Sequence, residues 1–148
     1  AVQGDDAVLC SLGAGAKGTV RTQGTQNIVR AMEKAGVRRF ICQSSLGVGD
    51  SWDNLSFFWK YIMFRGLLRQ AYEDHAGQEE CVRQSALDWT IVRPAAFTDG
   101  DRTGDYRHGF SPDDRTTKLK ISRADVADFM LRQLVDDTYR HKSPGLSY

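Results

Sequence analysis

The residues with the clearest chemical potential are the glycines of Gly13-Ala14-Gly15-Ala16-Lys17-Gly18, which have the spacing G-x-G-x-x-G. Glycines at this spacing let the backbone approach a pyrophosphate, and the amino terminus of a following helix favours the negative charge. The full motif also requires an acidic residue roughly 20 positions further on, which binds a ribose hydroxyl. The sequence has Gln43-Ser44-Ser45 at the end of the next strand instead, so the phosphate-binding role of the glycines stays open.

A second arrangement with chemical potential is Tyr61 followed by Arg65. Residues four apart share one face of a helix, and a cation beside a phenol lowers its pKa, which lets it act as a general acid near neutral pH. Arginine supplies the positive charge but, unlike lysine, cannot exchange a proton. Tyr61 also lies in an aromatic run, where a role in the core or in a pocket wall competes with catalysis. We retain Tyr61 as a candidate catalytic residue.

The elements around the glycine motif predict a parallel β-α-β unit. Residues 7–12 and 37–43 are apolar runs typical of buried strands, and residues 19–35 carry apolar side chains at helical spacing. A crossover of this length gives a right-handed unit whose ligand crevice lies at the carboxyl ends of its strands. We therefore expect a binding site at residues 12–18 and at the small-residue loop over residues 44–49.

The rest of the chain predicts further helices and strands of the same kind. We expect a single domain over residues 1–148, of α/β class, with a Rossmann-like parallel sheet and helices on both faces. The remaining elements predicted are a helical region in two pieces (54–86), a strand (89–93) closed by Pro94, a long loop (95–117), a short strand (119–121), a helix capped by Ser122 with Asp125 in the capping-box position, and a polar tail (138–148) with a turn at Pro144-Gly145.

Composition excludes several classes of partner. Lys and Arg number 20 against 19 Asp and Glu, a formal net charge of +1, which argues against nucleic acid and an acidic membrane as partners. The longest apolar run, residues 57–64, is too short to span a bilayer. Cys10, Cys42 and Cys81 have no metal-binding spacing and are typical of reduced cysteines. We therefore expect a cytoplasmic protein with no metal site.

Several stretches, in this order and spacing, resemble one known family. The chain is similar to the atypical short-chain dehydrogenase/reductases with an NmrA-like NAD(P)H-binding fold, and within them to the biliverdin reductase B, or flavin reductase, branch. The stretches that carry the resemblance include Asp6-Ala7-Val8-Leu9-Cys10-Ser11-Leu12-Gly13, Gly24-Thr25-Gln26-Asn27-Ile28-Val29, Leu87-Asp88-Trp89-Thr90-Ile91-Val92-Arg93-Pro94 and Ile121-Ser122-Arg123-Ala124-Asp125-Val126-Ala127.

The resemblance implies that residues 7–12 match the fourth strand of the family's sheet. On this register the phosphate-binding loop belongs upstream, on the order of 60 residues of the fold precede Ala1, and the chain is the carboxyl-terminal part of the fold. Leu12 and Gly13 would then line the adenosine side of the cofactor, while Gly15 and Gly18 serve a flexible turn. The other possibility is that the chain is a complete small domain, in which the glycine turn itself binds phosphate.

The resemblance also implies roles for residues at the other strand ends. Ser44 and Ser45 stand where the family has a Ser/Thr pair beside the nicotinamide, and Ser45 is the candidate catalytic residue of the two. A polar strand end that caps its own backbone is the competing interpretation. Residues Pro94, Ala95, Ala96 and Phe97 would pack against nicotinamide and ribose. The branch has a histidine just after this proline, so Ala95 removes an acid role there.

The activity implied is that of an NAD(P)H-dependent oxidoreductase, with NADP favoured over NAD. Its acceptor would be a planar, conjugated small molecule such as a flavin, quinone or tetrapyrrole. An alternative from another class is a non-catalytic NmrA-like sensor that binds the dinucleotide and reports its redox state. If the front of the fold is absent, an uncovered strand edge remains, which favours self-association as a homodimer.

Overall fold

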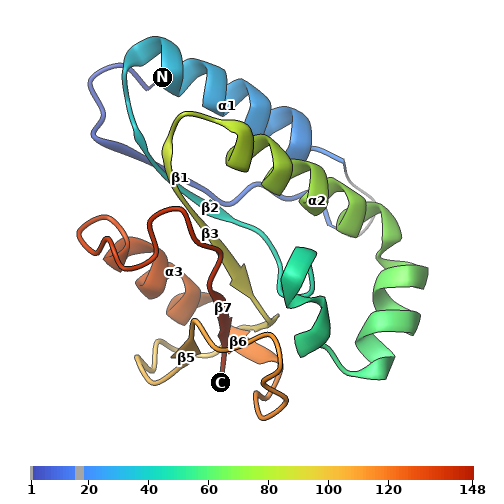
Figure 1. The fold of residues 1–148 in the computed structure, drawn as a ribbon. Coiled ribbons are helices and arrows are strands. Elements are labelled where there is room, and N and C mark those ends of the chain that lie inside the picture. Colours follow the sequence, from blue (N-terminus) through green and yellow to red (C-terminus); the bar gives the residue numbers. More distant parts are fainter. Residues whose placement is uncertain (1, 16–18) are drawn as a thin grey trace.

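The chain is analysed as a computed structural model, which describes residues 2–15 and 19–148. The chain folds into alternating helices and strands, as the sequence predicts (Figure 1). In chain order these are β1 (Ala7–Cys10), α1 (Arg21–Ala35), β2 (Arg39–Gln43), the 3-10 helix η1 (Gly49–Asn54), the π-helix η2 (Phe58–Leu67), α2 (Arg69–Gln84), β3 (Asp88–Pro94), β4 (Ala96–Thr98), β5 (Arg107–His108), β6 (Lys120–Ser122), α3 (Arg123–Arg132) and β7 (Gly145–Ser147).

The larger sheet has the strand order β1-β2-β3-β7-β5. β1, β2, β3 and β7 run parallel, whereas β5 is antiparallel to β7. Cys10 pairs with Cys42, which in turn pairs with Ile91, so the first three strands are in register. A small parallel sheet of β4 and β6 continues from the end of β3. Because parallel strands end at a common edge, the segments that follow β1, β2 and β3 meet there.

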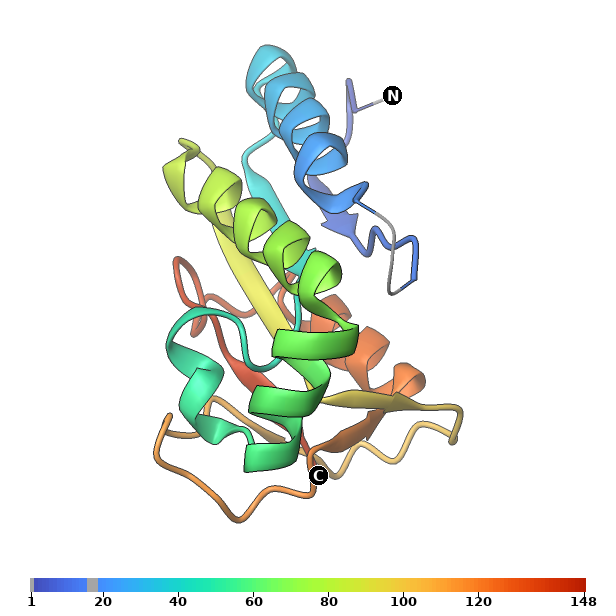
Figure 2. The same ribbon diagram turned by 90° about the vertical axis from the view of Figure 1, so that its right-hand side faces the viewer.

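Helices cover both faces of the larger sheet. α1 and α2 lie side by side on one face, and α3 lies on the opposite face (Figures 1 and 2). Successive side chains of a strand point to opposite faces. Accordingly, Phe40 and Cys42 are buried in the cluster that contains Val29 of α1, whereas Ile41 is buried in the cluster that contains Phe129 of α3. The predicted fold class, a Rossmann-like parallel sheet with helices on both faces, is confirmed.

The prediction of a polar tail with a turn at Pro144-Gly145 is wrong. Residues 145–147 form β7, which lies between β3 and β5 in the larger sheet. The Arg93 amide donates to the Pro144 carbonyl at 3.0 Å, and Leu146 is fully buried. A strand of three residues with one large apolar side chain produces no periodic pattern. Its stability comes from neighbouring strands that are distant in sequence.

Other helices and strands differ in smaller ways from those that the sequence predicts. The predicted loop over residues 95–117 contains β4 and β5, which are too short to be predicted from alternation. The predicted helical region over residues 54–86 contains η2 and α2, with Leu68 between them. The predicted cap of the last helix is confirmed, since Ser122 Oγ accepts a hydrogen bond from the Asp125 amide at 3.0 Å.

Asp125 also holds the loop between β4 and β5 against α3. Its carboxylate accepts hydrogen bonds from the amides of Thr103 and Gly104 at 2.9 and 2.8 Å, and from the Tyr148 hydroxyl at 2.6 Å. Burial raises the pKa of the Asp125 carboxyl, but these donors outweigh burial, so the pKa is lowered well below its usual range. The chain terminus, the loop and α3 are therefore joined at one carboxylate.

A buried ion pair joins β3 to α2. Arg93 is 1% exposed, and its Nε and Nη2 donate to the two carboxylate oxygens of Glu79 at 2.9 and 2.8 Å. Its Nη1 donates to Asp50 of η1. Burial raises the pKa of Glu79, but the hydrogen bonds and charge of Arg93 outweigh it, and the net pKa is lowered. This bidentate pair fixes the end of β3 relative to α2 and η1.

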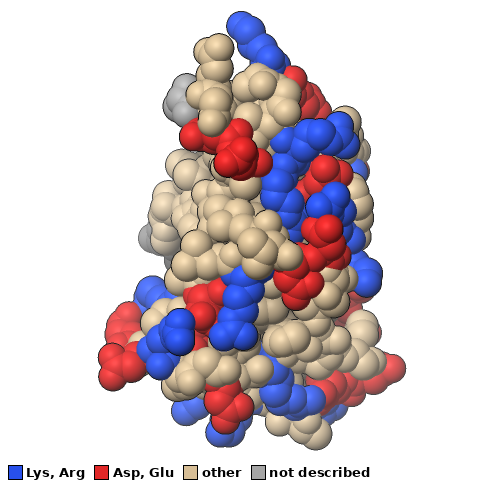
Figure 3. Space-filling view, turned by 90° about the vertical axis from the view of Figure 1, so that its left-hand side faces the viewer, with Lys and Arg blue, Asp and Glu red and all other residues tan. Residues whose placement is uncertain are grey.

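The surface carries charges of both signs. In the face drawn in Figure 3, Lys and Arg side chains alternate with Asp and Glu around an area without charged side chains. The full sequence has a formal net charge of +1. Within residues 2–15 and 19–148, no helix has the length and apolar character needed to cross a membrane.

Gly77 provides a test of the contact between α1 and α2. A Cβ at this position would lie 2.6 Å from Thr22 Oγ1, a hydroxyl that donates to the Asp74 carbonyl at 2.9 Å. We expect Gly77→Ala to lower the free energy of unfolding by about 1–3 kcal/mol, because overpacking forces the helices apart. Urea denaturation measures this change.

Gly66→Ala in η2 is the matched control, because its Cβ would meet nothing within 4 Å. Alanine favours a helix over glycine by about 1 kcal/mol, so this variant should be as stable as the parent or more so. Adding Thr22→Ala to Gly77→Ala should restore stability by removing the obstructing side chain. Equal stability of the two single glycine variants would contradict close packing at Gly77.

Candidate functional site

A cavity of about 960 Å³ lies at the carboxyl ends of β1, β2 and β3. Its wall is formed by the loop after β1, the segment after β2, the end of β3 with β4, and side chains of α2 and α3. This volume lies within the range of roughly 300–1,000 Å³ that is usual for small-molecule sites. The site therefore forms where the parallel β-α-β pattern predicts it.

Backbone hydrogen bonds position the segments that form the wall. The Ser44 amide donates to the Val92 carbonyl at 2.7 Å, and the Leu46 amide donates to the Pro94 carbonyl at 2.9 Å. The segment after β2 thus continues alongside β3. The Ala95 amide donates to the Leu146 carbonyl at 2.9 Å, so β7 holds the segment after β3. The binding residues lie on strand ends whose positions are set by the sheet.

Every residue predicted to bind the cofactor lines this cavity. The segments after β1, β2 and β3 contribute them from three separate parts of the sequence, and the fold brings them together. They are Leu12, Gly13, Gly15, Ser44, Ser45, Pro94, Ala95, Ala96 and Phe97. The role of each residue toward a cofactor stays a prediction.

Tyr61 lies on η2, outside the cavity wall. The residue is 45% exposed, and its ring packs against the Phe57 ring at 4.8 Å between ring centres. The Arg65 guanidinium lies over the same ring, 5.2 Å from its centre. The two residues thus share a helix face, as the spacing predicts, and the cation contacts the aromatic ring. The predicted catalytic role of Tyr61 has no support from its position.

The glycine motif is only partly described. Gly15 has a φ of +71°, a backbone conformation that favours glycine. A Cβ at Gly13 would lie 3.3 Å from Nη2 of Arg21, so the missing side chain leaves room for that guanidinium group. Gly18 lies outside the described residues. The described part of the motif therefore accommodates an arginine, and its phosphate-binding role stays a prediction.

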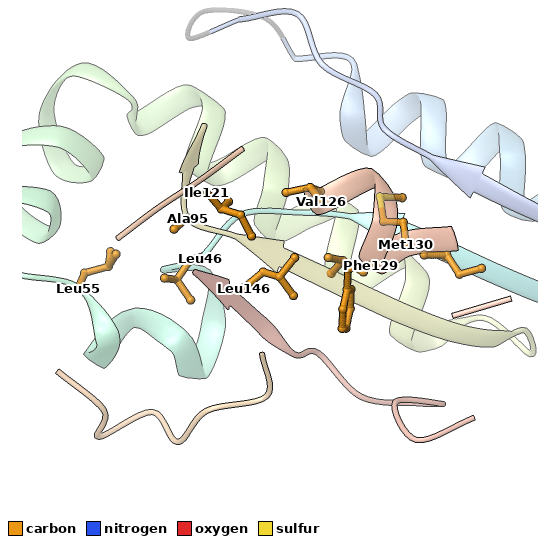
Figure 4. Close-up of a cluster of buried hydrophobic side chains, with 10 residues drawn as sticks. Leu46, Leu55, Ala95, Ile121, Val126, Phe129, Met130 and Leu146 are labelled. Carbon is orange, nitrogen blue, oxygen red and sulfur yellow. The ribbon is translucent and has the colours of Figure 1, made fainter. Parts of the chain in front are cut away.

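The apolar wall of the cavity is continuous with the core. Figure 4 shows the buried cluster between the sheet and α3, drawn from β2, β3, β6, α3 and β7 and the segments beside them. Five members of this cluster also line the cavity, namely Leu46, Leu55, Ala95, Val126 and Met130. Because these side chains are packed on their other sides, the wall offers a rigid apolar surface to a flat ligand.

The charged side chains in the described lining of the cavity are two arginines, and each contacts a carboxylate outside the lining. They are Arg21 and Arg123, and the described lining contains no Asp or Glu. Arg123 pairs with Asp99 and lies over the Phe97 ring, 5.1 Å from its centre. The hydroxyl groups of Ser44 and Ser45 are further polar groups of the wall. The electrostatic character of the cavity therefore favours an anionic ligand with a planar, apolar part.

His75 of α2 is a residue of the wall to which the sequence assigns no role. Gln78 Nε2 donates to Thr25 Oγ1 at 3.2 Å, which leaves Gln78 Oε1 facing His75 Nδ1 at 3.3 Å. Nδ1 therefore carries the proton, and Nε2 is an acceptor. Burial, and then the charge of Arg21, lower the pKa of His75 to about 4. The ring is neutral at pH 7.

A pattern in the sequence could have indicated His75. Ala71, His75, Gln78 and Val82 recur at helical spacing, and all four are buried or half-buried on the inner side of α2. Polar residues within an otherwise buried helical stripe indicate hydrogen bonding in the interior or a site. The sequence pattern does not decide between these two roles, because Thr25, the hydrogen-bond partner of Gln78, comes from α1.

The serine hydroxyls differ in their surroundings. Ser45 is half-buried, and its hydroxyl donates to the Leu46 carbonyl at 3.3 Å, a long hydrogen bond. Ser44 is 2% exposed, and its hydroxyl is buried without a hydrogen-bond partner among the described residues. Ser45 is therefore the more accessible of the two to a ligand in the cavity.

Among the described residues, potential metal ligands do not form a cluster around the cavity. In the part of the chain that the structure describes, no three His, Cys, Asp or Glu side chains are placed to hold a metal ion. Cys10, Cys42 and Cys81 are free cysteines. Cys10 and Cys42 pair in register on β1 and β2 and lie in the core beneath α1.

The comparison with protein families agrees with this site. The model of a family described as NAD(P)H-binding matches residues 1–137. The chain belongs to the NAD(P)H-binding family. The family therefore binds the cofactor class that the resemblance predicts, a nicotinamide dinucleotide. A Rossmann-like sheet with a cavity at its strand ends is the architecture that binds such dinucleotides.

The proteins to which this chain is similar are longer than the chain. The UPF0659 protein YMR090W of Saccharomyces cerevisiae is 34% identical over 141 residues, which cover 91% of this chain and 59% of the relative. ChuY, an anaerobillin reductase from Escherichia coli O157:H7, has a TM-score of 0.75 and 26% identity, and the match covers 95% of this chain and 63% of ChuY. The chain thus spans about 59–63% of their lengths.

A second solved structure contains a bound dinucleotide. A short-chain dehydrogenase/reductase from Veillonella parvula in complex with NADP has a TM-score of 0.78 and 20% identity, and the match covers 99% of this chain and 64% of that protein. At this identity the likeness concerns the fold.

The lowered pKa of His75 predicts how the free energy of unfolding depends on pH. The unfolded chain protonates this histidine near pH 6.5, and the folded chain near pH 4. Between these values the unfolded state binds the extra proton, so the free energy of unfolding falls as the pH falls, by on the order of 2–3 kcal/mol in total. His75→Gln should lose this part of the pH dependence, as measured by urea denaturation between pH 7 and pH 4.

His141→Gln is the control, because the His141 side chain is 53% exposed. A profile for His75→Gln that runs parallel to that of the parent would mean that the folded chain does not hold His75 neutral.

Proposed function

We propose that this chain is part of an NAD(P)H-dependent oxidoreductase of the atypical short-chain dehydrogenase/reductase type. The acceptor would be a planar conjugated molecule such as a flavin, a quinone or a tetrapyrrole. The observation that carries the proposal is the cavity at the strand ends, where a rigid apolar wall, serine hydroxyls and cationic side chains meet. Membership of the NAD(P)H-binding family supports the cofactor, and the similarity to ChuY supports a reductase.

The residues of the cavity fit the proposed cofactor. When bound, the reduced nicotinamide supplies the hydride. The segment 94–97 offers a largely apolar surface to a flat ring, and Leu12, Gly13 and Gly15 line the cavity from the loop after β1, where we propose that the adenosine binds. The lack of Asp and Glu in the described lining avoids repulsion of phosphate groups. We favour NADP over NAD because of the resemblance.

Ser45 is the residue that we propose to orient the reacting groups. Its hydroxyl points to a carbonyl at 3.3 Å, so little hydrogen-bond energy is lost when it turns toward a ligand. A hydroxyl there can donate to a carbonyl group as negative charge develops on its oxygen. The proposed role is thus positioning and charge stabilisation.

No residue in the described wall of the cavity is an evident donor of the proton that completes the reduction. The described lining contains no tyrosine. The Nδ1 proton of His75 is used in the hydrogen bond with Gln78, and the ring is neutral near pH 7. In the proposed reaction, solvent supplies the proton. This suits acceptors whose reduced form gains a proton rapidly from water.

The test is an assay of NADPH and NADH oxidation with a panel of flavins, quinones and tetrapyrroles. We expect Ser45→Ala to lower kcat/KM by up to roughly 100-fold, by analogy with loss of one donor to a developing oxyanion. Ser45→Thr, which keeps the hydroxyl, is the matched control and should retain most activity. Tyr61→Phe should change the rate little, because Tyr61 lies outside the cavity wall. Unchanged turnover in Ser45→Ala would remove the role proposed for Ser45.

The alternative function is a non-catalytic NmrA-like sensor of the dinucleotide redox state. It is favoured by the lack of a Tyr/Lys pair in the described wall of the cavity. A sensor should bind NADPH without oxidising it in the presence of any acceptor. Sustained turnover excludes this alternative, and saturable binding without turnover supports it.

We also propose that this chain, when it is produced by itself, self-associates as a homodimer. On one side β1 pairs with β2, and on the other side no strand of the described residues pairs with it. An open strand edge offers unpaired amides and carbonyls to a second chain, and Leu9 on this strand is 40% exposed. Light scattering with size-exclusion chromatography should give a mass that rises toward the dimer with concentration. A constant monomer mass would contradict the proposal.

A further inference from the structure

Arg21, the first residue of α1, places a buried guanidinium group in the cavity wall. Its side chain is 10% exposed. Nη2 lies close to Gly13, where a Cβ would come within 3.3 Å of it. On the other side, Asp74 of α2 approaches the group. The cation therefore lies between the loop after β1 and α2.

Asp74 satisfies Arg21 only in part. Its carboxylate accepts hydrogen bonds from the amides of Arg21 and Thr22, each at 2.9 Å, and thereby caps the amino terminus of α1. Its contact with the guanidinium Nη1 is longer, at 3.4 Å. Burial raises the pKa of Asp74, and these donors, first the Thr22 amide, lower it overall. The carboxylate is thus shared among several donors, with the guanidinium the most distant.

The guanidinium group has capacity for a further acceptor. A guanidinium has five N–H donors. Among the described residues, the contact with Asp74 is its one hydrogen bond, and Nε is buried without a partner. A buried, charged donor that lacks an acceptor costs free energy. An acceptor supplied from within the cavity would remove this cost.

The neighbouring groups favour an anion over a neutral acceptor. The described lining has no carboxylate, and its other arginine, Arg123, already pairs with Asp99. His75 beside Arg21 is neutral, and its Nε2 accepts hydrogen bonds and does not compete as a cation. Arg21 is therefore the buried positive charge of the described lining, and its carboxylate partner Asp74 is shared with two backbone amides.

We propose that Arg21 binds an oxyanion, a carboxylate or phosphate group, of the molecule that occupies this cavity. The planar fork of a guanidinium matches such groups with two parallel hydrogen bonds. The oxyanion belongs either to an acidic acceptor or to a phosphate of the dinucleotide. The choice between these two sources of the oxyanion rests on the proposed function. Anion binding at Arg21 itself does not require any reductase activity.

The first experiment measures anion binding directly. The protein is titrated with inorganic phosphate and with acetate, and the ring signals of His75 are followed by ¹H–¹⁵N NMR. We expect a saturable shift, because an anion on Arg21 screens the charge that acts on His75. Arg21→Gln should abolish the response, Arg21→Lys should weaken it, and Arg38→Gln, at an exposed arginine, should keep it. No saturable response, or an equal response in Arg21→Gln, would mean an adventitious ion only and would overturn the proposal.

The second experiment identifies the source of the oxyanion. Fluorescence titration gives the Kd of NADPH, and the reductase assay gives KM for biliverdin against its dimethyl ester and for FMN against riboflavin. We expect Arg21→Gln to weaken one of these interactions by about 10- to 100-fold, as for loss of a charge-assisted hydrogen bond.

Each outcome of the second experiment has one meaning. A weaker Kd for NADPH assigns the dinucleotide phosphate, and a higher KM for biliverdin or FMN, with no change for the ester or riboflavin, assigns the acceptor. No change in any of them overturns the proposal. If no acceptor is reduced by the parent protein, the proposed function fails, while the NMR titration still decides whether Arg21 binds an oxyanion.

Discussion

The parallel register of β1, β2 and β3 is the constraint on which the site depends. Cys10, Cys42 and Ile91 lie side by side across the three strands, so the chain leaves all three at the same edge of the sheet. The three following segments meet there without any direct link in sequence. Backbone hydrogen bonds from Ser44 and Leu46 to β3 extend this register beyond the last strand residue of β2. The cavity is thus a product of sheet pairing.

α2 connects this edge to the rest of the molecule through polar side chains on its inner face. Asp74 caps α1, His75 reaches the cavity, and Gln78 fixes the tautomer of that histidine. Glu79, one residue further, neutralises Arg93 of β3. Asp74, Gln78 and Glu79 are each costly to bury alone, and each is satisfied by a partner on another element. The same helix face therefore stabilises the fold and sets the electrostatics of the cavity.

The cavity combines two environments that a redox ligand needs. One side is the exposed end of the core cluster around Val126 and Met130, which excludes water and holds a flat group. The other side carries Arg21, His75 and the serine hydroxyls, whose hydrogen-bond directions are set by their neighbours. Positive charge without a facing carboxylate in the described lining gives the cavity a preference for anions. These properties agree with membership of the NAD(P)H-binding family.

The sequence by itself determined the class of the fold and the edge at which the site forms. Apolar runs at residues 7–12, 37–43 and 89–93 and the helical spacing between them specify buried parallel strands, because such patterns depend only on local periodicity. Tertiary structure alone decided that residues 145–147 enter the sheet, since their burial is supplied by β3 and β5. It also decided that His75 and Arg21 face the cavity and that Tyr61 does not. The His75 ring is oriented by Gln78 of its own helix, which in turn donates to Thr25 of α1, and Arg21 contacts Asp74 of α2. Gln78 and Thr25, like Arg21 and Asp74, are about 50 residues apart in sequence, and no local pattern encodes such pairs.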